Sequence, residues 1–232
     1  MSGDGPTGKR VVVMQPYWFP YAGYFRLLAE ADVFVLFDCV QFPRRSRVHR
    51  CEVPGPGGAT QWLTLPLARQ PRDVRICDLE FAPGARAEMD RRLARHPWIA
   101  SARGPAADPV REHLHAPLER PVDHLEEGLR LVASLLGLEC TFARSSSLEL
   151  DPALRRGDRV RAAALAFGGE DYVNAPSGRS LYAAEDFAAE GLGLWFLRPY
   201  DGDFFQLLPA LLREDPDVVR GDVLLQGGLV RG

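Results

Sequence analysis

The chain has 232 residues, of which 46% are hydrophobic and 25% are charged, and its formal net charge is -3. This balance gives no electrostatic footprint for a nucleic acid or an anionic membrane, and no apolar run approaches the roughly 20 residues that span a bilayer. The four cysteines show no C-x-x-C spacing, which indicates free thiols rather than a zinc knuckle or a redox pair. We therefore expect a cytoplasmic protein that binds neither nucleic acid nor membrane.

The N-terminal part of the chain predicts two buried strands around a short helix. Residues 1–8 are expected to form a disordered tail, and residues 9–14 to form a buried strand. The stretch QPYWFPYAGYF, residues 15–25, holds six aromatic residues and two prolines, which make a rigid turn into a helix over 21–31. The run VFVLF, 33–37, is typical of a strand buried on both faces.

The rest of the chain continues this alternation of strands and helices. Segments 51–53 and 61–67 flank the turn PGPGG and predict a hairpin. Further strands are expected at 74–81, 138–143, 172–174 and 192–197, helices at 83–96, 121–136, 157–167, 182–190 and 204–212, and a loop at 103–117. The alternation predicts an α/β fold, with a mixed or mostly parallel sheet flanked by helices. We expect one domain over 9–232, with a small helical subdomain at about 83–137 as the open alternative.

A strongly basic segment follows the second predicted strand. Asp38 ends that strand, and DCVQFPRRSRVHR then places four arginines and a histidine within residues 44–50. Ligands of open α/β sheets bind at the carboxyl ends of strands, and the arginine fork suits phosphate or carboxylate. The alternative is a solvated loop with ion pairs. The pattern makes Asp38 a candidate base, and makes Gln41, Arg45 and Arg50 candidate ligands of an anion.

The tripeptide His49-Arg50-Cys51 raises a second hypothesis. In an extended segment His49 and Cys51 point to the same face, and a histidine can accept a thiol proton. A nucleophilic Cys51 would imply acyl transfer or amide hydrolysis through a thioester. The alternative is a half-buried cysteine beside a surface histidine, since no third orienting group is visible.

Two other motifs carry weaker signals. In NAPSGRS, Gly178 permits close backbone approach, while Asn174 and Ser177 could bind oxyanions; the alternative is a plain turn. The segment is neither a P-loop nor a nucleophile elbow, and the glycines form no dinucleotide fingerprint, so we expect no cofactor. His113, His115 and His124 lack ligand partners at familiar spacing, so we expect surface histidines and no metal.

The aromatic stretch that opens the chain has two interpretations. Its side chains either fill the core, or Tyr17, Tyr24 and their neighbours form the wall of a small-molecule pocket beside Asp38. Gln15, at the end of the first strand, would then be a polar group of that pocket.

The sequence resembles the WbqC-like protein family. The likeness lies in QPYWFPYAGYF, ADVFVLFDCVQFPRRSRVHR, QWLTLPL, SSSLEL, FGGEDYVNAPSGRSLY and GDVLLQGG, which appear in the family's order and span nearly the whole chain. The resemblance implies a place in surface-polysaccharide or natural-product biosynthesis, and transfer of a glycyl or other acyl group to an amine. The positions that match the motif are Gln15, Pro16, Pro20, Gly23, Asp38, Gln41, Arg45, Arg50, Gly178 and Tyr182.

Three positions depart from the pattern of this family. Met14 stands where many relatives have histidine, Cys39 follows Asp38 where Asp or Asn is common, and His49-Arg50-Cys51 replaces Asn-Arg-Asn. If the family's base is that first histidine, either His49 substitutes for it or the chemistry differs.

Together these observations predict a biosynthetic acyl or aminoacyl transferase. It would move the acyl group from a thioester, on coenzyme A or on an acyl- or peptidyl-carrier protein, to an amine of a sugar nucleotide or natural-product intermediate. The alternatives are a thioesterase or amide hydrolase that uses Cys51 and His49, and a non-catalytic protein that binds an anionic ligand or a carrier protein. The predicted catalytic residues are Asp38, His49 and Cys51, and the predicted substrate-binding residues are Gln15, Tyr17, Tyr24, Gln41, Arg45, Arg50, Asn174, Ser177, Gly178 and Tyr182.

Overall fold

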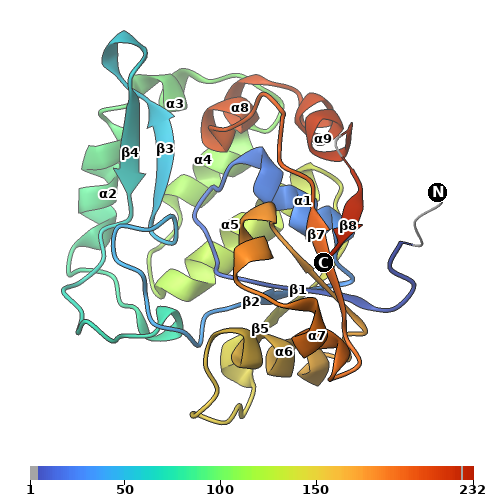
Figure 1. Cartoon of the computed structure of the whole chain (residues 1–232). Coiled ribbons are helices and arrows are strands. Elements are labelled where there is room, and N and C mark those ends of the chain that lie inside the picture. Colours follow the sequence, from blue (N-terminus) through green and yellow to red (C-terminus); the bar gives the residue numbers. More distant parts are fainter. Residues whose placement is uncertain (1–4, 226) are drawn as a thin grey trace.

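The centre of the molecule is a six-stranded, mostly parallel sheet. A computed structural model describes residues 5–225 and 227–232, so the predicted tail lies partly outside the described residues. The strand order is β5-β2-β1-β6-β7-β8, and only β8 runs antiparallel to its neighbour (Figure 1). The strands are β1 (Arg10–Met14), β2 (Val33–Leu36), β5 (Thr141–Arg144), β6 (Asp171–Asn174), β7 (Gly193–Leu197) and β8 (Leu229–Arg231). This confirms the predicted α/β class.

Helices cover both faces of the sheet, as Figure 1 shows. One face meets a large buried cluster that includes residues of α1 (Ala22–Glu30), α2 (Ala85–Leu93), α3 (Pro97–Ser101), α4 (Ala107–His115), α5 (Pro121–Leu135), α8 (Leu207–Arg213) and α9 (Pro216–Leu225). The other face meets a smaller cluster with α6 (Arg156–Ala166) and α7 (Ala184–Ala188). None of the helices within the described residues combines the length and the apolar character that crossing a bilayer requires.

The two central strands β1 and β2 are mostly apolar because they are buried on both sides. Val11 and Val13 of β1 belong to the smaller cluster, while Val12 between them belongs to the larger one. Successive side chains of a strand point to opposite faces, so a strand between two helical layers needs apolar residues at every position.

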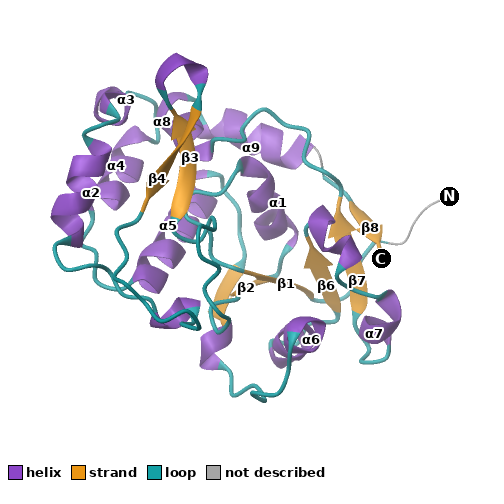
Figure 2. Cartoon of the chain, turned by 60° about the vertical axis from the view of Figure 1, so that its left-hand side comes forward, coloured by secondary structure: helices purple, strands orange, loops and turns teal. Residues whose placement is uncertain are grey.

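A separate hairpin stands apart from the central sheet (Figure 2). It pairs β3 (Arg50–Pro54) with β4 (Thr60–Thr64) in antiparallel register, and the short 3-10 helix η1 (Pro56–Gly58) forms its turn. The hairpin confirms the sequence prediction. Three further 3-10 helices, η2 (Ile76–Asp78), η3 (Ser145–Ser147) and η4 (Pro176–Ser180), occupy connecting segments.

Two local predictions were wrong. Segment 74–81 is not a strand: it contains η2, and its pairing is confined to the bridges Gln41↔Arg75 and Leu67↔Phe81. Segment 103–117 is not a loop, because it holds α4, whose apolar residues Val110 and Leu114 are buried. Helix α9 and strand β8 were not foreseen.

The direction of winding reverses between β1 and β6. From β1 the chain builds β2 and then β5 on one side, and later builds β6 and β7 on the other. Most parallel neighbours in the sheet pair over four residues, but β1 and β6 pair at Arg10↔Asp171 and Val11↔Tyr172 only. Their carboxyl ends therefore diverge, and such a reversal point is where open α/β sheets bind ligands.

Candidate functional site

Two adjoining cavities open at the carboxyl edge of the sheet. One has a volume of about 630 Å³ and the other about 290 Å³, and both are lined by Gln15 and Phe37. Gln15 follows β1 and Phe37 follows β2, so the cavities meet at the ends of the two central strands. Volumes of this order are typical of small-molecule sites.

Arginines line the larger cavity. Arg155, Arg156 and Arg159 come from the beginning of α6, and Arg75 comes from the segment that pairs with Gln41. The other lining residues are Gln15, Phe37, Cys39, Val40, Gln41, Ser145, Ser146, Leu148, Leu150, Pro152 and Leu154. No carboxylate or imidazole lines either cavity within the part of the chain that the structure describes. The cavity therefore combines an apolar floor with a concentration of positive charge.

Local hydrogen bonds hold most of these guanidinium groups in place. Arg159 donates to the backbone carbonyls of Asp151 and Leu154 and, through Nη1, to the Cys39 sulfur at 3.7 Å. Arg75 is ion-paired with Asp78 at 2.6 Å. Arg156 begins α6 with a φ of 46°, and among the described residues its side chain has no polar partner. The Arg156 guanidinium is thus available to an anionic ligand near the N-terminus of α6.

The smaller cavity lies between the diverging ends of β1 and β6. Tyr17, Asn174, Ser177 and Tyr182 line it. Asn174 is buried, and its Oδ1 accepts the Ala175 amide at 2.8 Å. These residues offer amide, hydroxyl and phenol groups, which suit a neutral polar ligand such as a sugar.

Gly178 is required by the packing of this cavity. A Cβ at this position would lie 2.2 Å from Asn174 Nδ2, well inside van der Waals contact. The glycine therefore allows η4 to pack directly on the Asn174 amide, as the close approach expected from the sequence requires.

Asp38 is buried and fully hydrogen-bonded. Its carboxylate accepts the Ser145 hydroxyl at 3.0 Å, the Ser146 amide at 2.8 Å and the Ser146 hydroxyl at 2.6 Å, and its side chain is 0% exposed. Ser145 Oγ in turn accepts the backbone amides of Asp38 and Cys39. This network joins the ends of β2 and β5, so Asp38 positions the cavity wall rather than facing a substrate as a base.

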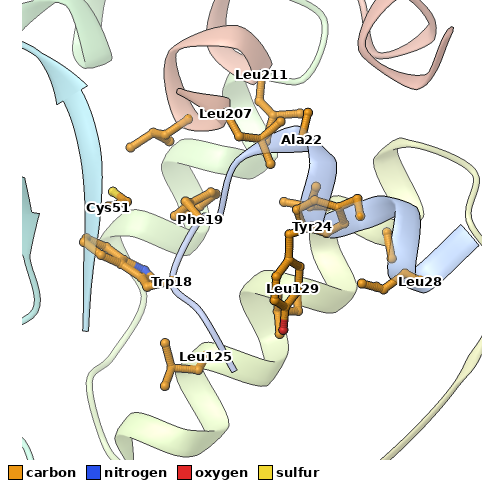
Figure 3. Close-up of a cluster of buried hydrophobic side chains, with 14 of the residues drawn as sticks. Trp18, Phe19, Ala22, Tyr24, Leu28, Cys51, Leu125, Leu129, Leu207 and Leu211 are labelled. Atoms are coloured by element: carbon orange, nitrogen blue, oxygen red, sulfur yellow. The ribbon is translucent and has the colours of Figure 1, made fainter. Parts of the chain in front are cut away.

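Cys51 lies in the hydrophobic core, not in the site. It is 1% exposed and belongs to the same buried cluster as Trp18, Phe19 and Leu207 (Figure 3). Burial raises the pKa of its thiol well above the usual range. A neutral, enclosed thiol is a poor nucleophile, so we do not retain Cys51 in a catalytic role.

His49 lies in a different environment from Cys51. Its ring packs edge-on against Phe42 at 5.1 Å, and burial together with the charge of Arg50 lowers its pKa to about 4. Strand β3 begins only at Arg50, so the extended geometry assumed for His49 and Cys51 is not present, and within the described residues no hydrogen bond joins them.

Arg45 and Arg50 also lie away from the sheet-edge cavities. The Arg50 guanidinium stacks on Trp62 at 4.1 Å and donates to the Arg45 carbonyl. Arg45 lines a third cavity, together with His49. The basic segment thus turns away from the carboxyl edge with the hairpin, and neither arginine remains a ligand of the predicted pocket.

Most of the opening aromatic stretch belongs to the core. Trp18, Phe19, Tyr24 and Phe25 are buried in the large cluster. Figure 3 shows Tyr24 among leucines of that cluster, and its hydroxyl donates to the Gln15 carbonyl at 2.8 Å. Tyr24 therefore fixes the backbone at Gln15, whereas Tyr17, the other predicted site tyrosine of this stretch, lines a cavity.

The residues with metal-ligand chemistry lie elsewhere, between α4 and α5. His113, His124 and Glu127 each offer one ligand atom, and these atoms lie within 4.8 Å of one another. The two imidazole rings are stacked, with centroids 4.2 Å apart and planes 10° apart. A metal lies close to the plane of each imidazole that binds it, so two stacked rings cannot share one ion without rotation. Both histidines are buried, contrary to the expectation of surface histidines.

Sequence reasoning thus found part of the site. Of the predicted substrate-binding residues, seven line the two cavities: Gln15, Tyr17, Gln41, Asn174, Ser177, Gly178 and Tyr182. Arg75, Arg155, Arg156, Arg159 and Cys39 were missed as site residues. The predicted helix over 157–167 begins among the last three of these arginines, but the sequence does not distinguish them from ordinary solvated charges.

Comparison with known proteins identifies relatives of this chain. The model of the WbqC-like protein family matches residues 15–209, which confirms the resemblance seen in the motifs. The uncharacterized protein Rv1507c of Mycobacterium tuberculosis (strain ATCC 25618 / H37Rv) is 26% identical over 208 residues, covering 86% of this chain and 87% of the relative. No solved structure matches the chain.

Proposed function

We propose a function for this chain, which belongs to the WbqC-like protein family. It binds a phosphorylated small molecule of the sugar-nucleotide class at the carboxyl edge of the sheet, and transfers an acyl or aminoacyl group from a thioester to an amine of that molecule. The observation that carries the proposal is the pair of joined cavities at the reversal point between β1 and β6, one basic and one neutral and polar.

The charge of the basic cavity is the evidence for an anionic group in the substrate. Arg75, Arg155, Arg156 and Arg159 surround a partly apolar space, so a ligand in the cavity meets several positive charges. Guanidinium groups bind phosphate oxygens through paired hydrogen bonds. A diphosphate near the N-terminus of α6 would neutralise the charge of these arginines. Gln41 and Ser146 would be neutral hydrogen-bond donors beside it.

The lining of the neutral cavity is the evidence for a sugar-like group at the other end of the substrate. Gln15 lines both cavities, so a ligand that passes it reaches the Asn174, Ser177 and Tyr182 groups. These side chains can donate to and accept from hydroxyl and amine groups. A molecule with a phosphorylated end and a polar, uncharged end matches the two cavities in this order.

The transfer step requires no residue of the chain to form a bond. The neutral amine attacks the thioester carbonyl carbon, the C–N bond forms, the C–S bond breaks, and the departing thiolate takes the amine proton. Holding the amine next to the thioester supplies the rate gain that proximity gives. If a covalent relay operates, the thiol facing the site is Cys39, whose sulfur accepts a hydrogen bond from Arg159.

A second candidate function is binding without catalysis. It is favoured by the hydrogen-bonded state of Asp38 and by the absence of carboxylates and imidazoles from the linings of the two cavities within the described residues. Such a protein would bind a phosphorylated ligand and release it unchanged.

Ligand binding tests the first half of the proposal. Isothermal titration with UDP-N-acetylglucosamine and with UDP should show binding that Arg159→Ala and Arg156→Ala each weaken by about tenfold to hundredfold, the value of a charge-assisted hydrogen bond. Arg103→Ala is the matched control, because Arg103 is exposed, bonds only to backbone carbonyls and lies outside both cavities. Equal affinities in all three variants would refute an anion site at α6.

A turnover assay tests the second part of the proposal, the transfer of the acyl group to an amine. Acetyl- or glycyl-coenzyme A is incubated with the chain, with and without an amino-sugar nucleotide, and free thiol is measured. Release only with the amine supports transfer, release without it indicates hydrolysis, and binding without release favours the second candidate. Intact mass of Cys39→Ala and Cys51→Ala, compared with the unmodified chain, shows whether a covalent adduct depends on the site thiol or on the core thiol.

A further inference from the structure

A third cavity lies beside the β3–β4 hairpin, and four arginines line it. Its volume is about 410 Å³. Its wall combines the loop before β3, the segment after β4 and one residue of α2: Phe42, Arg44, Arg45, His49, Thr64, Leu65, Pro66, Leu67, Ala68, Arg69, Gln70 and Arg92. Figure 2 shows the hairpin and α2 side by side at the end of the molecule away from β7 and β8.

The positive charge of this cavity is poorly compensated. Of its four arginines, Arg92 is ion-paired with Glu88 at 2.8 Å, and Arg44 donates to the Gln70 carbonyl at 2.8 Å. Within the described residues, neither the Arg45 nor the Arg69 guanidinium has a hydrogen-bond or ion-pair partner. Like charges brought together in this way repel one another unless an anion lies between them.

A polar atom without a partner adds a second observation. His49 lines the same cavity, and its Nδ1 is buried without a hydrogen bond among the described residues. Buried polar nitrogens normally have partners, and an unpaired one commonly marks a missing ligand or water. The cavity thus holds two unpaired guanidinium groups around an open volume, and the His49 ring forms part of its wall.

The segment that lines this cavity continues into the sheet-edge site. Gln41 lines the basic sheet-edge cavity, and Phe42 lines the third cavity. Gln41 and Arg45 are four residues apart, which limits their Cα separation to about 14 Å even in a fully extended chain. A thioester whose phosphate groups and reactive carbon are joined by a flexible arm has the shape to reach from one cavity to the other.

We propose that the hairpin cavity binds the phosphate groups of the acyl donor, as a second anion site separate from the one at the sheet edge. This assignment rests on the proposed function, because it presumes a thioester donor. The donor then enters from the hairpin side with its phosphates between Arg45 and Arg69, and its thioester points along residues 41–45 toward the acceptor.

The two sites use different arginines, so they can be tested separately. Arg45→Gln and Arg69→Gln remove a charge at exposed positions that have no side-chain partner, so the fold should be unaffected. With the sheet-edge site saturated by UDP-N-acetylglucosamine, titration with coenzyme A and with inorganic pyrophosphate should show that each variant binds both probes about tenfold to hundredfold more weakly than the unmodified chain. Arg95→Gln, at an exposed position outside the cavity, is the matched control and should bind as the unmodified chain does.

The outcomes separate the donor site from the proposed function. Binding of UDP-N-acetylglucosamine should be unchanged in Arg45→Gln and Arg69→Gln, and should weaken only in the α6 variants. Coenzyme A binding that is insensitive to Arg45 and Arg69 would overturn the proposal. Pyrophosphate binding that coenzyme A does not compete with, measured while UDP-N-acetylglucosamine saturates the sheet-edge site, would also overturn it. Because these are binding measurements, loss of coenzyme A affinity in the two variants supports the site even if no acyl transfer is found.

Discussion

The stacked histidines between α4 and α5 predict that the folded state is sensitive to acid. Burial lowers the pKa of His113 to about 4 and that of His124 to about 3, so both are neutral in the folded protein near neutral pH. The unfolded chain binds protons at these residues with a pKa of about 6.5. Below that value the unfolded state holds more protons, so the free energy of unfolding falls as pH falls.

The size of the effect follows from these pKa values. At pH 5 each histidine lowers the free energy of unfolding by about 2 kcal/mol relative to pH 8, and the pair by about 4 kcal/mol. This is a large part of the roughly 5–15 kcal/mol that stabilises a typical domain. The loss begins near pH 6.5 and levels off only below the folded-state pKa values.

Urea unfolding between pH 5 and pH 8 measures this dependence directly. His113 Nε2 and His124 Nδ1 have no hydrogen-bond partner among the described residues, so replacement of either ring by leucine sacrifices no polar contact at these atoms. His113→Leu and His124→Leu should each remove about 2 kcal/mol of the pH-dependent loss. His115→Leu is the control, because His115 is exposed on the same helix. A pH dependence that is identical in all three variants would refute the reasoning.

Three other changes test the architecture of the sheet edge and the core. Gly178→Ala places a Cβ against Asn174 Nδ2, so thermal unfolding should show a loss of about 1–3 kcal/mol; an unchanged melting temperature would contradict the tight packing. Asp38→Asn replaces an acceptor of three hydrogen bonds and should cost about 2–3 kcal/mol in urea unfolding, whereas full stability would show that the Ser145 and Ser146 contacts contribute little. Cys51→Ala should lower stability by about 1 kcal/mol and leave ligand affinity unchanged, and a large drop in affinity would return Cys51 to the site.

The sheet and one half of the site were predictable from the sequence because they depend on local patterns. Apolar runs of strand length identified the central strands, and a parallel sheet brings the residues after those strands to one edge. Gln15, Asn174 and Gly178, which each follow or end a central strand, therefore line one cavity. Segment 74–81 shows the limit of such patterns, because its spaced apolar residues are buried in a bent connection rather than in a strand.

The residues that sequence reasoning misplaced depend on tertiary contacts. Alternation along β3 says that Cys51 and Val53 share a face, but it cannot say that this face meets the core. The arginines before β3 lie close in sequence to Asp38, yet the hairpin carries Arg45 and Arg50 to another cavity. Nothing local distinguishes the arginines at the start of α6 from ordinary solvated charges.

The hydrogen bonds of Asp38 explain how distant parts of the chain form one cavity. Its carboxylate ties the end of β2 to Ser145 and Ser146 of η3, and the chain leaves η3 toward α6. The backbone oxygen of Asp38 also accepts the amide of Cys77, which fixes the segment that carries Arg75. Asp38 therefore holds the segment of Arg75 directly and fixes η3, from which the chain continues toward the arginines of α6. A side chain in this place needs several acceptor sites, and Asp38 uses both carboxylate oxygens to hold the cavity wall.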